Sequence, residues 1–130
     1  LIVQPHQGGP QRVAKIYRPG IVPRGEVLDR VARIDPERRV QVIESGSSEG
    51  YAYEVMEYCA EGSLRDRLAA GALSGPPLLA LIAELAAAIA SVHTAGLVHR
   101  DLKPENVLVR GNAPLRLGML CANIQRRHTF

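Results

Sequence analysis

A change of pattern near residue 59 most constrains what this chain can fold into. Residues 1–58 contain short β-prone runs separated by Gly, Pro and polar turns, whereas residues 63–96 carry apolar side chains at helical spacing. Strands that come first and helices that follow predict an α+β fold in two parts. We therefore expect an antiparallel sheet with one helix over 1–58 and a helical part over 59–130.

The first part contains signals for two β-hairpins with a helix between them. Helical spacing of apolar residues predicts the helix over 26–34, and Asp35-Pro36 predicts its end because proline restricts the residue before it. A polar, Gly-containing stretch at 45–50 predicts the turn of the second hairpin. The four strands are expected at 1–3, 12–17, 40–43 and 51–58.

The second part begins with a helix-start signal and contains the longest helical pattern. Ser63 followed by Asp66 resembles a capping box, and Gly71 predicts the end of a short helix. The next helix is predicted from Pro76-Pro77 to Gly96, through an Ala-rich stretch that favours helix.

Composition excludes several classes of protein. A length of 130 residues suits one compact domain, and 46% hydrophobic with 22% charged residues argues against disorder. Two cysteines without a CxxC pair argue against a disulfide scaffold or zinc ribbon, so we expect a reducing, cytoplasmic setting. Because no uninterrupted apolar run approaches about 18 residues, we expect no membrane segment.

The basic residues are mostly arginine, and lysine is rare. The net charge is +3, but the arginines are spread along the chain and Trp is absent, so a nucleic-acid partner is not expected. There are 14 Arg and only two Lys, Lys15 and Lys103, so each lysine calls for a local reason.

The most informative stretch is L-V-H-R-D-L-K-P-E-N-V-L-V at 97–109, after the long helical pattern. It resembles the catalytic loop of protein kinases, H-R-D-L-x-x-x-N, and Lys103 resembles the Ser/Thr version of that loop. The resemblance implies that Asp101 accepts or orients the proton of the attacking hydroxyl, and that Lys103 places positive charge near the phosphate. It also implies that Asn106 offers an amide oxygen to Mg²⁺, while His99 is structural.

A second resemblance lies upstream, at V-A-K-I over 13–16. It is similar to the V-A-I-K strand of protein kinases with the last two residues transposed, so Lys15 is expected to contact the α- and β-phosphates of ATP. That lysine needs a glutamate from the following helix, and Glu26 is the candidate. A plain solvent-exposed glutamate near a helix start is the competing interpretation of Glu26.

The segment V-M-E-Y-C that ends at Cys59 resembles the strand and hinge that hold adenine. The resemblance implies that Met56 is the gatekeeper and that the backbone of Glu57 and Cys59 hydrogen-bonds the adenine edge. Ala14 and Leu108 are expected to sandwich the ring between apolar surfaces.

The resemblance weakens at three places. The Gly-rich loop that covers the phosphates is not found before Lys15, and nothing resembles the family after the catalytic loop and its strand. The position of the metal-binding D-F-G motif falls at Met119–Cys121, where Met119 has no carboxylate although Leu120 could pack like Phe. We therefore expect a small lobe lacking the Gly-rich loop over 1–58, and a large lobe truncated after the catalytic loop over 59–130. A reading-frame shift after codon 115 would explain the break.

The sequence thus predicts a Ser/Thr protein-kinase-like domain that uses ATP and Mg²⁺ to phosphorylate Ser/Thr hydroxyls of a protein substrate. We expect this chain itself to be weak or inactive, because the missing motifs act on the phosphates. The alternative is a pseudokinase, a nucleotide-binding or interaction module without catalysis. A third interpretation, a remnant of a broken gene, predicts a chain that does not unfold cooperatively.

Overall fold

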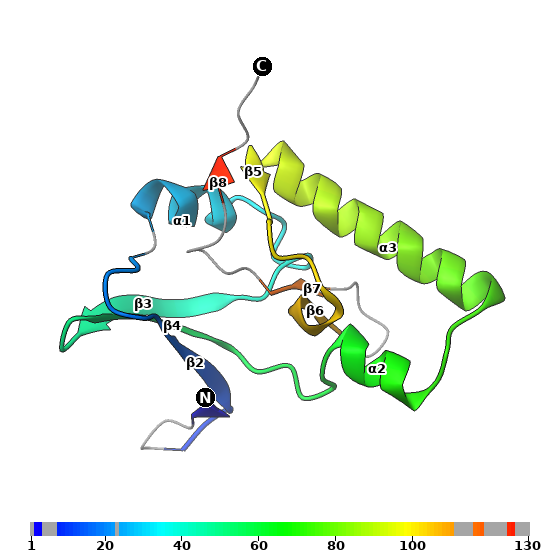
Figure 1. Ribbon diagram of the computed structural model, residues 1–130, viewed down its shortest axis with the longest axis horizontal. Coiled ribbons are helices and arrows are strands. Elements are labelled where there is room, and N and C mark those ends of the chain that lie inside the picture. The colour runs from blue at the N-terminus through cyan, green and yellow to red at the C-terminus, as the bar shows by residue number, and fades with distance from the viewer. Residues whose placement is uncertain (1, 4–7, 23, 111–115, 119–124, 127–130) are drawn as a thin grey trace.

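The chain folds into a sheet with one helix followed by a helical part, so the α+β prediction is confirmed (Figure 1). This computed structural model describes residues 2–3, 8–22, 24–110, 116–118 and 125–126. The elements in the first part are β1 (Ile2–Val3), β2 (Arg12–Ile16), α1 (Gly25–Ala32), β3 (Val42–Ser48) and β4 (Tyr51–Glu57). Those in the second are α2 (Leu64–Ala70), α3 (Gly75–Thr94), β5 (Leu97–Val98), the 3₁₀ turn η1 (Pro104–Asn106), β6 (Val107–Leu108), β7 (Arg116–Leu117) and β8 (Gln125–Arg126).

The first part is built on a four-stranded antiparallel sheet in the order β1-β2-β4-β3. In its register Val13 lies opposite Met56 and Lys15 lies opposite Glu54. Alternate residues of β4 are buried, namely Ala52, Glu54 and Met56, as expected where successive side chains point to opposite faces. The sheet therefore has one inward face, which carries Lys15 on β2.

The turn predicted at 45–50 is wrong in extent, because β3 continues through the polar residues to Ser48. Ser48 still pairs with Tyr51, so only Glu49 and Gly50 form the turn. Both have positive φ, 52° and 83°, which is the backbone conformation of a two-residue type I′ hairpin. Pairing along β4 outweighed the low strand propensity of the Ser- and Gly-containing stretch.

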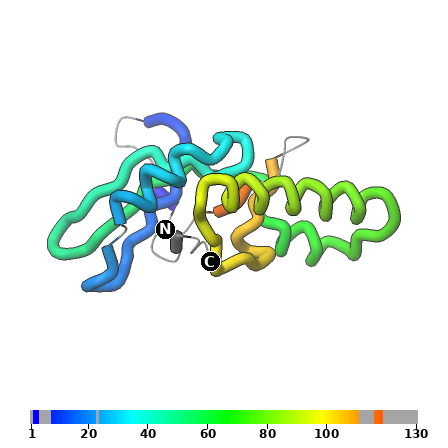
Figure 2. The backbone as a smooth tube through the Cα atoms, turned by 90° about the horizontal axis from the view of Figure 1, so that it is seen from above, coloured from blue at the N-terminus to red at the C-terminus, as the bar shows by residue number. Residues whose placement is uncertain are grey.

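One hydrophobic core joins the two parts. It contains residues of α1, α2 and α3 and of the short strands β5, β6 and β7, including Val31, Leu64, Val92 and Leu97. Leu117 in β7 is 0% exposed, and its backbone N–H and C=O bond Arg38 and Val40 in the segment after α1. Figure 2 shows the sheet and α1 on one side and α2 and α3 on the other. The junction between them therefore places β2 and β4 opposite the segment that follows β5.

The helical part confirms the predicted helix signals. Ser63 and Asp66 form a complete capping box at the start of α2, and Gly71 lies at its C-terminal end. Helix α3 buries Ala88 and Val92 but leaves Leu79 67% exposed. By length and composition alone α3 could cross a membrane, and only 11% of its most apolar window is buried. Core helices of soluble proteins satisfy the same composition criterion, so this observation leaves the expected lack of a membrane segment a prediction.

Candidate functional site

The three predicted catalytic residues lie together after β5. The Lys103 ammonium is 3.4 Å from Oδ1 of Asp101. The Asn106 amide donates to Oδ2 of Asp101 at 3.0 Å and to its backbone carbonyl at 2.8 Å. The carboxylate of Asp101 is therefore held between a cation and an amide, in a half-buried position.

Local backbone geometry and His99 set the shape of this loop. Arg100 has φ of 61°, a left-handed conformation that is uncommon for a non-glycine residue. Nδ1 of His99 accepts the N–H of Asp101 at 3.3 Å, so Nε2 carries the proton and donates to the Gly118 carbonyl at 3.1 Å. Burial lowers the pKa of His99, although the Gly118 carbonyl and the Asp101 charge oppose that shift. A neutral His99, only 5% exposed, therefore connects the loop to the residue after β7.

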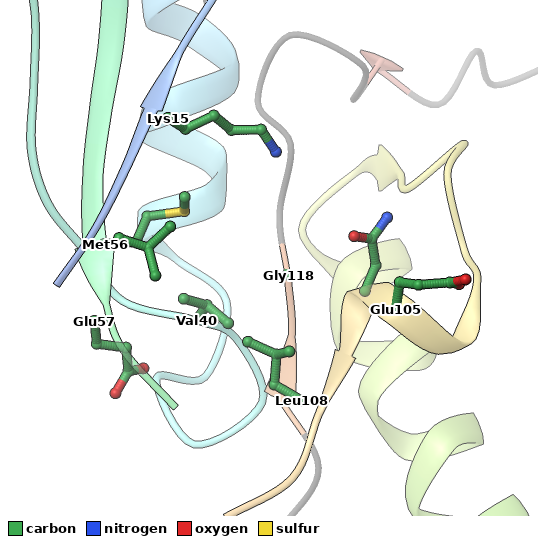
Figure 3. A pocket seen from close by; sticks show the side chains of 9 residues that line it. Lys15, Val40, Met56, Glu57, Glu105, Leu108 and Gly118 are labelled. Atoms are coloured by element: carbon green, nitrogen blue, oxygen red, sulfur yellow. The ribbon is translucent and has the colours of Figure 1, made fainter. Parts of the chain in front are cut away.

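A cavity of about 130 Å³ lies between the sheet and this loop (Figure 3). Lys15 extends from β2 across it toward the segment of Gly118, whereas the carboxylate of Glu105 points away (Figure 3). Glu105 instead lies 3.2 Å from Arg65 Nε. Five of the residues predicted from the sequence line the cavity: Lys15, Met56, Glu57, Asn106 and Leu108.

Val13 lines the cavity where the sequence analysis expected Ala14. Strand alternation gives the reason, because residues two apart on β2 share a face and Val13 therefore lies on the face of Lys15. Ala14 pairs with Val55 on the other face of the sheet. Because the motif is transposed, the expected apolar residue on β2 was placed one position too late. The alternation of side chains along the strand was the signal that could have identified Val13.

Glu26 lies in the first turn of α1 and is not among the residues that line this cavity. Its Oε1 is 4.0 Å from Nη2 of Arg30, and its side chain is 57% exposed. An exposed pair of this kind on one helix contributes little to stability. The pairing of Glu26 with Lys15 stays a prediction.

Cys59 lines a second cavity of about 230 Å³ beside the segment after β4. Burial raises the pKa of its thiol and the nearby Glu57 charge adds to the effect, while Arg116 and Arg110 oppose it. The side chain is therefore a protonated thiol, in keeping with the expectation that the backbone of Cys59, and not a reactive thiol, serves the site. Adenine bonding by that backbone stays a prediction.

Arg116 is a site residue that the sequence analysis missed. It is 5% exposed and pairs with Glu57 at the end of β4, while its Nη2 lies 3.5 Å from Glu37. Oε1 of Glu57 also accepts the Gln41 N–H at 2.8 Å. Because these partners are far apart in sequence, no local sequence pattern predicts this contact between β7 and the end of β4.

The residues that the structure describes make a poor magnesium site. Mg²⁺ is usually held through one or two carboxylates plus phosphate oxygens and water. Among the described ranges no group of three or more His, Cys, Asp or Glu gathers, and the Asp101 carboxylate already contacts Lys103 and Asn106. Asn106 offers one amide oxygen, so metal binding by Asn106 stays a prediction. Met119 and Leu120 lie outside the described residues.

Comparison with known proteins identifies the family. The family model for the protein kinase domain matches residues 28–120. The chain is 39% identical over 74 residues to serine/threonine-protein kinase pkn2 of Myxococcus xanthus, covering 57% of this chain and 9% of that protein. It is 34% identical over 88 residues to serine/threonine-protein kinase PknL of Mycobacterium tuberculosis, covering 67% and 22% respectively.

A plant protein gives a similar result. CBL-interacting protein kinase 12 of rice is 38% identical over 90 residues, covering 69% of this chain and 17% of that protein. The chain thus spans between 9% and 22% of the length of these three relatives. The family match also includes α3, which is therefore part of the kinase-like domain. Because the family model matches most of the chain, this chain belongs to the protein kinase family, and its relatives are Ser/Thr kinases.

Proposed function

We propose that this chain binds ATP between its sheet and its catalytic loop, as the Ser/Thr kinase domain of a cytoplasmic protein. One observation carries the proposal: a single cavity is lined by Lys15 and Met56 from the sheet and by Asn106 and Leu108 from the helical part. That cavity joins a cation suited to phosphates with apolar side chains suited to a flat ring. We keep the division into a small lobe over 1–58 and a large lobe over 59–130 as part of the proposal.

Adenine would occupy the apolar part of the cavity. Val13, Met56 and Leu108 supply apolar surface there. The backbone of Glu57 and Cys59, where β4 ends, would bond the ring edge. The Glu57 carbonyl and the Cys59 N–H are the proposed groups, because the Glu57 N–H already donates to the Gln41 carbonyl at 3.0 Å and the Cys59 carbonyl accepts the Gly62 N–H at 3.1 Å. Arg116 supports this region by pairing with the Glu57 side chain at the end of β4.

The phosphates would extend toward Lys15 and the loop at 99–106. In the family reaction the oxygen of a Ser or Thr hydroxyl bonds to the γ-phosphorus, and the bond from that phosphorus to ADP breaks. Asp101 would accept or orient the hydroxyl proton, and Lys103 would neutralise charge on the moving phosphoryl group. A protein substrate is the implied partner. Mg²⁺ supplies further charge neutralisation in this family, with Asn106 as the proposed ligand.

For this chain itself we propose weak or no transfer. Among the described residues no group of three or more His, Cys, Asp or Glu gathers, and the Asp101 carboxylate already contacts Lys103 and Asn106. Charge neutralisation supplies much of the rate of phosphoryl transfer. The same observation favours a second function, a pseudokinase that binds nucleotide or a partner without catalysis. The two functions differ in transfer and agree in ATP binding.

Thermal unfolding of residues 1–130 with ATP tests the shared part of the proposal. Bound ligand raises the unfolding temperature because it stabilises by RT ln(1 + [L]/Kd). We expect a shift at millimolar ATP that changes little when Mg²⁺ is removed. No shift at that concentration would reject nucleotide binding.

A transfer assay with labelled ATP separates the two functions. Transfer that is measurable and is lost in Asp101→Asn would establish a working kinase and reject the expectation of weak or no activity. An ATP shift without transfer, unchanged in Asp101→Asn, would favour the pseudokinase.

A further inference from the structure

Glu54 is a fully buried carboxylate in the middle of β4, and none of the roles above uses it. Its exposed fraction is 0%, and it lies between Ala52 and Met56 on the inward face of the sheet. Moving a carboxylate out of water is strongly unfavourable unless opposite charge and hydrogen bonds compensate. A buried glutamate in a strand therefore calls for partners.

The structure shows one partner for one of its two oxygens. The Tyr17 hydroxyl donates to Oε2 of Glu54 at 2.6 Å, and both side chains are buried. Oε1 is buried as well and accepts no hydrogen bond from any described residue. Tyr17 thus fixes the orientation of Glu54 and leaves Oε1 open for a donor.

The strand register places a cationic residue opposite Glu54. Lys15 lies directly opposite Glu54 in the β2–β4 pairing. Directly opposite residues share a face and have Cβ atoms about 4.5–5.5 Å apart, which is within reach of two long side chains. Lys15 also lines the cavity and extends across it (Figure 3), so a side chain that begins opposite Glu54 reaches toward the proposed phosphate site.

We propose that Glu54 is the counter-ion of Lys15, a positioning residue that holds the ammonium for the nucleotide phosphates, with Tyr17 orienting Glu54. Charge attraction is stronger for a buried carboxylate than for the exposed Glu26, because the effective dielectric constant is lower inside the protein. The effect on ATP rests on the proposed function, whereas the effect of the charge pair on folding does not.

A double-mutant cycle with Glu54→Gln and Lys15→Met tests the proposal. Glutamine has the shape of glutamate and can still accept the Tyr17 hydroxyl, so the variant removes mainly the charge. Residues that are coupled in this way change each other's effect on an equilibrium constant by about twofold to about 150-fold. We therefore expect Glu54→Gln to raise the ATP dissociation constant about tenfold beside Lys15, and less than about twofold beside Met at position 15.

Urea unfolding of the parent chain, the two single variants and the double variant gives a second test, which does not depend on ATP. We expect the two substitutions to be non-additive, with a coupling of about fivefold or more in the unfolding equilibrium constant. If ATP does not bind, the proposed function fails. The coupling measured by unfolding still shows whether Glu54 is the counter-ion of Lys15.

The chain offers a matched control in a second Tyr–Glu pair. The Tyr53 hydroxyl donates to Oε1 of Glu44 at 2.7 Å on the exposed surface of β3 and β4. We expect Glu44→Gln to change ATP affinity and the unfolding constant by less than about twofold, because exposed charges are screened by water. An equal effect of Glu44→Gln would reject a special role for Glu54.

Tyr17→Phe keeps the test decisive if Glu54→Gln does not fold. It removes the hydroxyl that orients Glu54 and should weaken ATP binding beside Lys15 but not beside Met at position 15. Additive effects of either variant with Lys15→Met, within about twofold, would overturn the proposal and leave Glu54 as a hydrogen-bond partner of Tyr17 only.

Discussion

The two walls of the cavity are held in place by different forces. On the sheet side, Lys15 and Met56 are fixed by the backbone ladder between β2 and β4. On the loop side, Asn106 is fixed by the hydrogen bonds that its side chain donates to Asp101, which follows the strained residue Arg100. Substitutions in the sheet should therefore change ligand affinity while the geometry of the site stays the same, whereas substitutions in the loop should change that geometry.

The largest expected effect comes from the residue that joins the two walls. Leu117→Ala removes a fully buried side chain whose backbone bonds the segment after α1. We expect it to lower the free energy of unfolding by about 2–5 kcal/mol, because a cavity adds to the lost burial. Urea unfolding measures the change. Leu79→Ala on exposed α3 is the control, with an expected change within about 0.5 kcal/mol. Similar losses for both would mean that Leu117 is not part of a packed core.

The sheet wall is tested by Lys15→Ala. A charge-assisted contact to phosphate contributes about 1.5–3 kcal/mol, so its loss should weaken ATP binding roughly tenfold or more. The thermal shift with ATP should disappear at concentrations that shift the parent chain, while the unliganded unfolding remains cooperative. Arg67→Ala, which removes an exposed cation on α2, should keep the shift. An ATP shift that survives Lys15→Ala would remove this residue from the site.

The loop wall is tested by Asn106→Ala. The substitution removes two hydrogen bonds to Asp101, at 2.8 and 3.0 Å. We expect a loss of about 1–3 kcal/mol in unfolding free energy, because each bond contributes about 1 kcal/mol. Binding of adenosine should change little, since the apolar wall stays intact. If adenosine affinity falls as much as stability, the two walls are not independent.

The smallest expected effect is a pH dependence at the loop. Burial lowers the pKa of His99 in the folded chain below its ordinary value near 6.5. The unfolded chain therefore binds more protons between the two pKa values, and stability rises with pH in that window. We expect the His99 contribution to be complete above about pH 6.5 and to decline as the pH falls below it, by at most about 1.4 kcal/mol per pH unit. Urea unfolding at pH 5.5 and 7.5 measures this slope, and His99→Gln should flatten it.

Much of the fold followed from local patterns. Alternation predicted the strands of both hairpins, apolar spacing predicted α1 and α3, and the capping box at Ser63 and Asp66 formed as expected. The extent of β3 could not be predicted, because its polar residues are strands only through pairing with β4. Local sequence therefore determined where elements begin better than how far they pair.

The site was less predictable than the fold. Motifs brought Lys15, Met56 and Asn106 to one cavity, yet they gave Ala14 where alternation places Val13. The roles of Arg116 and Glu54 depend on contacts between residues far apart in the chain, and no motif contains them. Burial of charge is a property of the folded chain, so only the structure could draw attention to these residues.

A calorimetric titration of the 130-residue chain with ATP and with adenosine tests both halves of the proposed binding site at once. The proposal is that one cavity binds the ring between apolar side chains and the phosphates at Lys15. We predict that both ligands bind and that ATP binds about tenfold more tightly, which corresponds to about 1.4 kcal/mol from the phosphate contacts. No heat of binding at millimolar ATP, or equal affinity for the two ligands, would contradict the proposal.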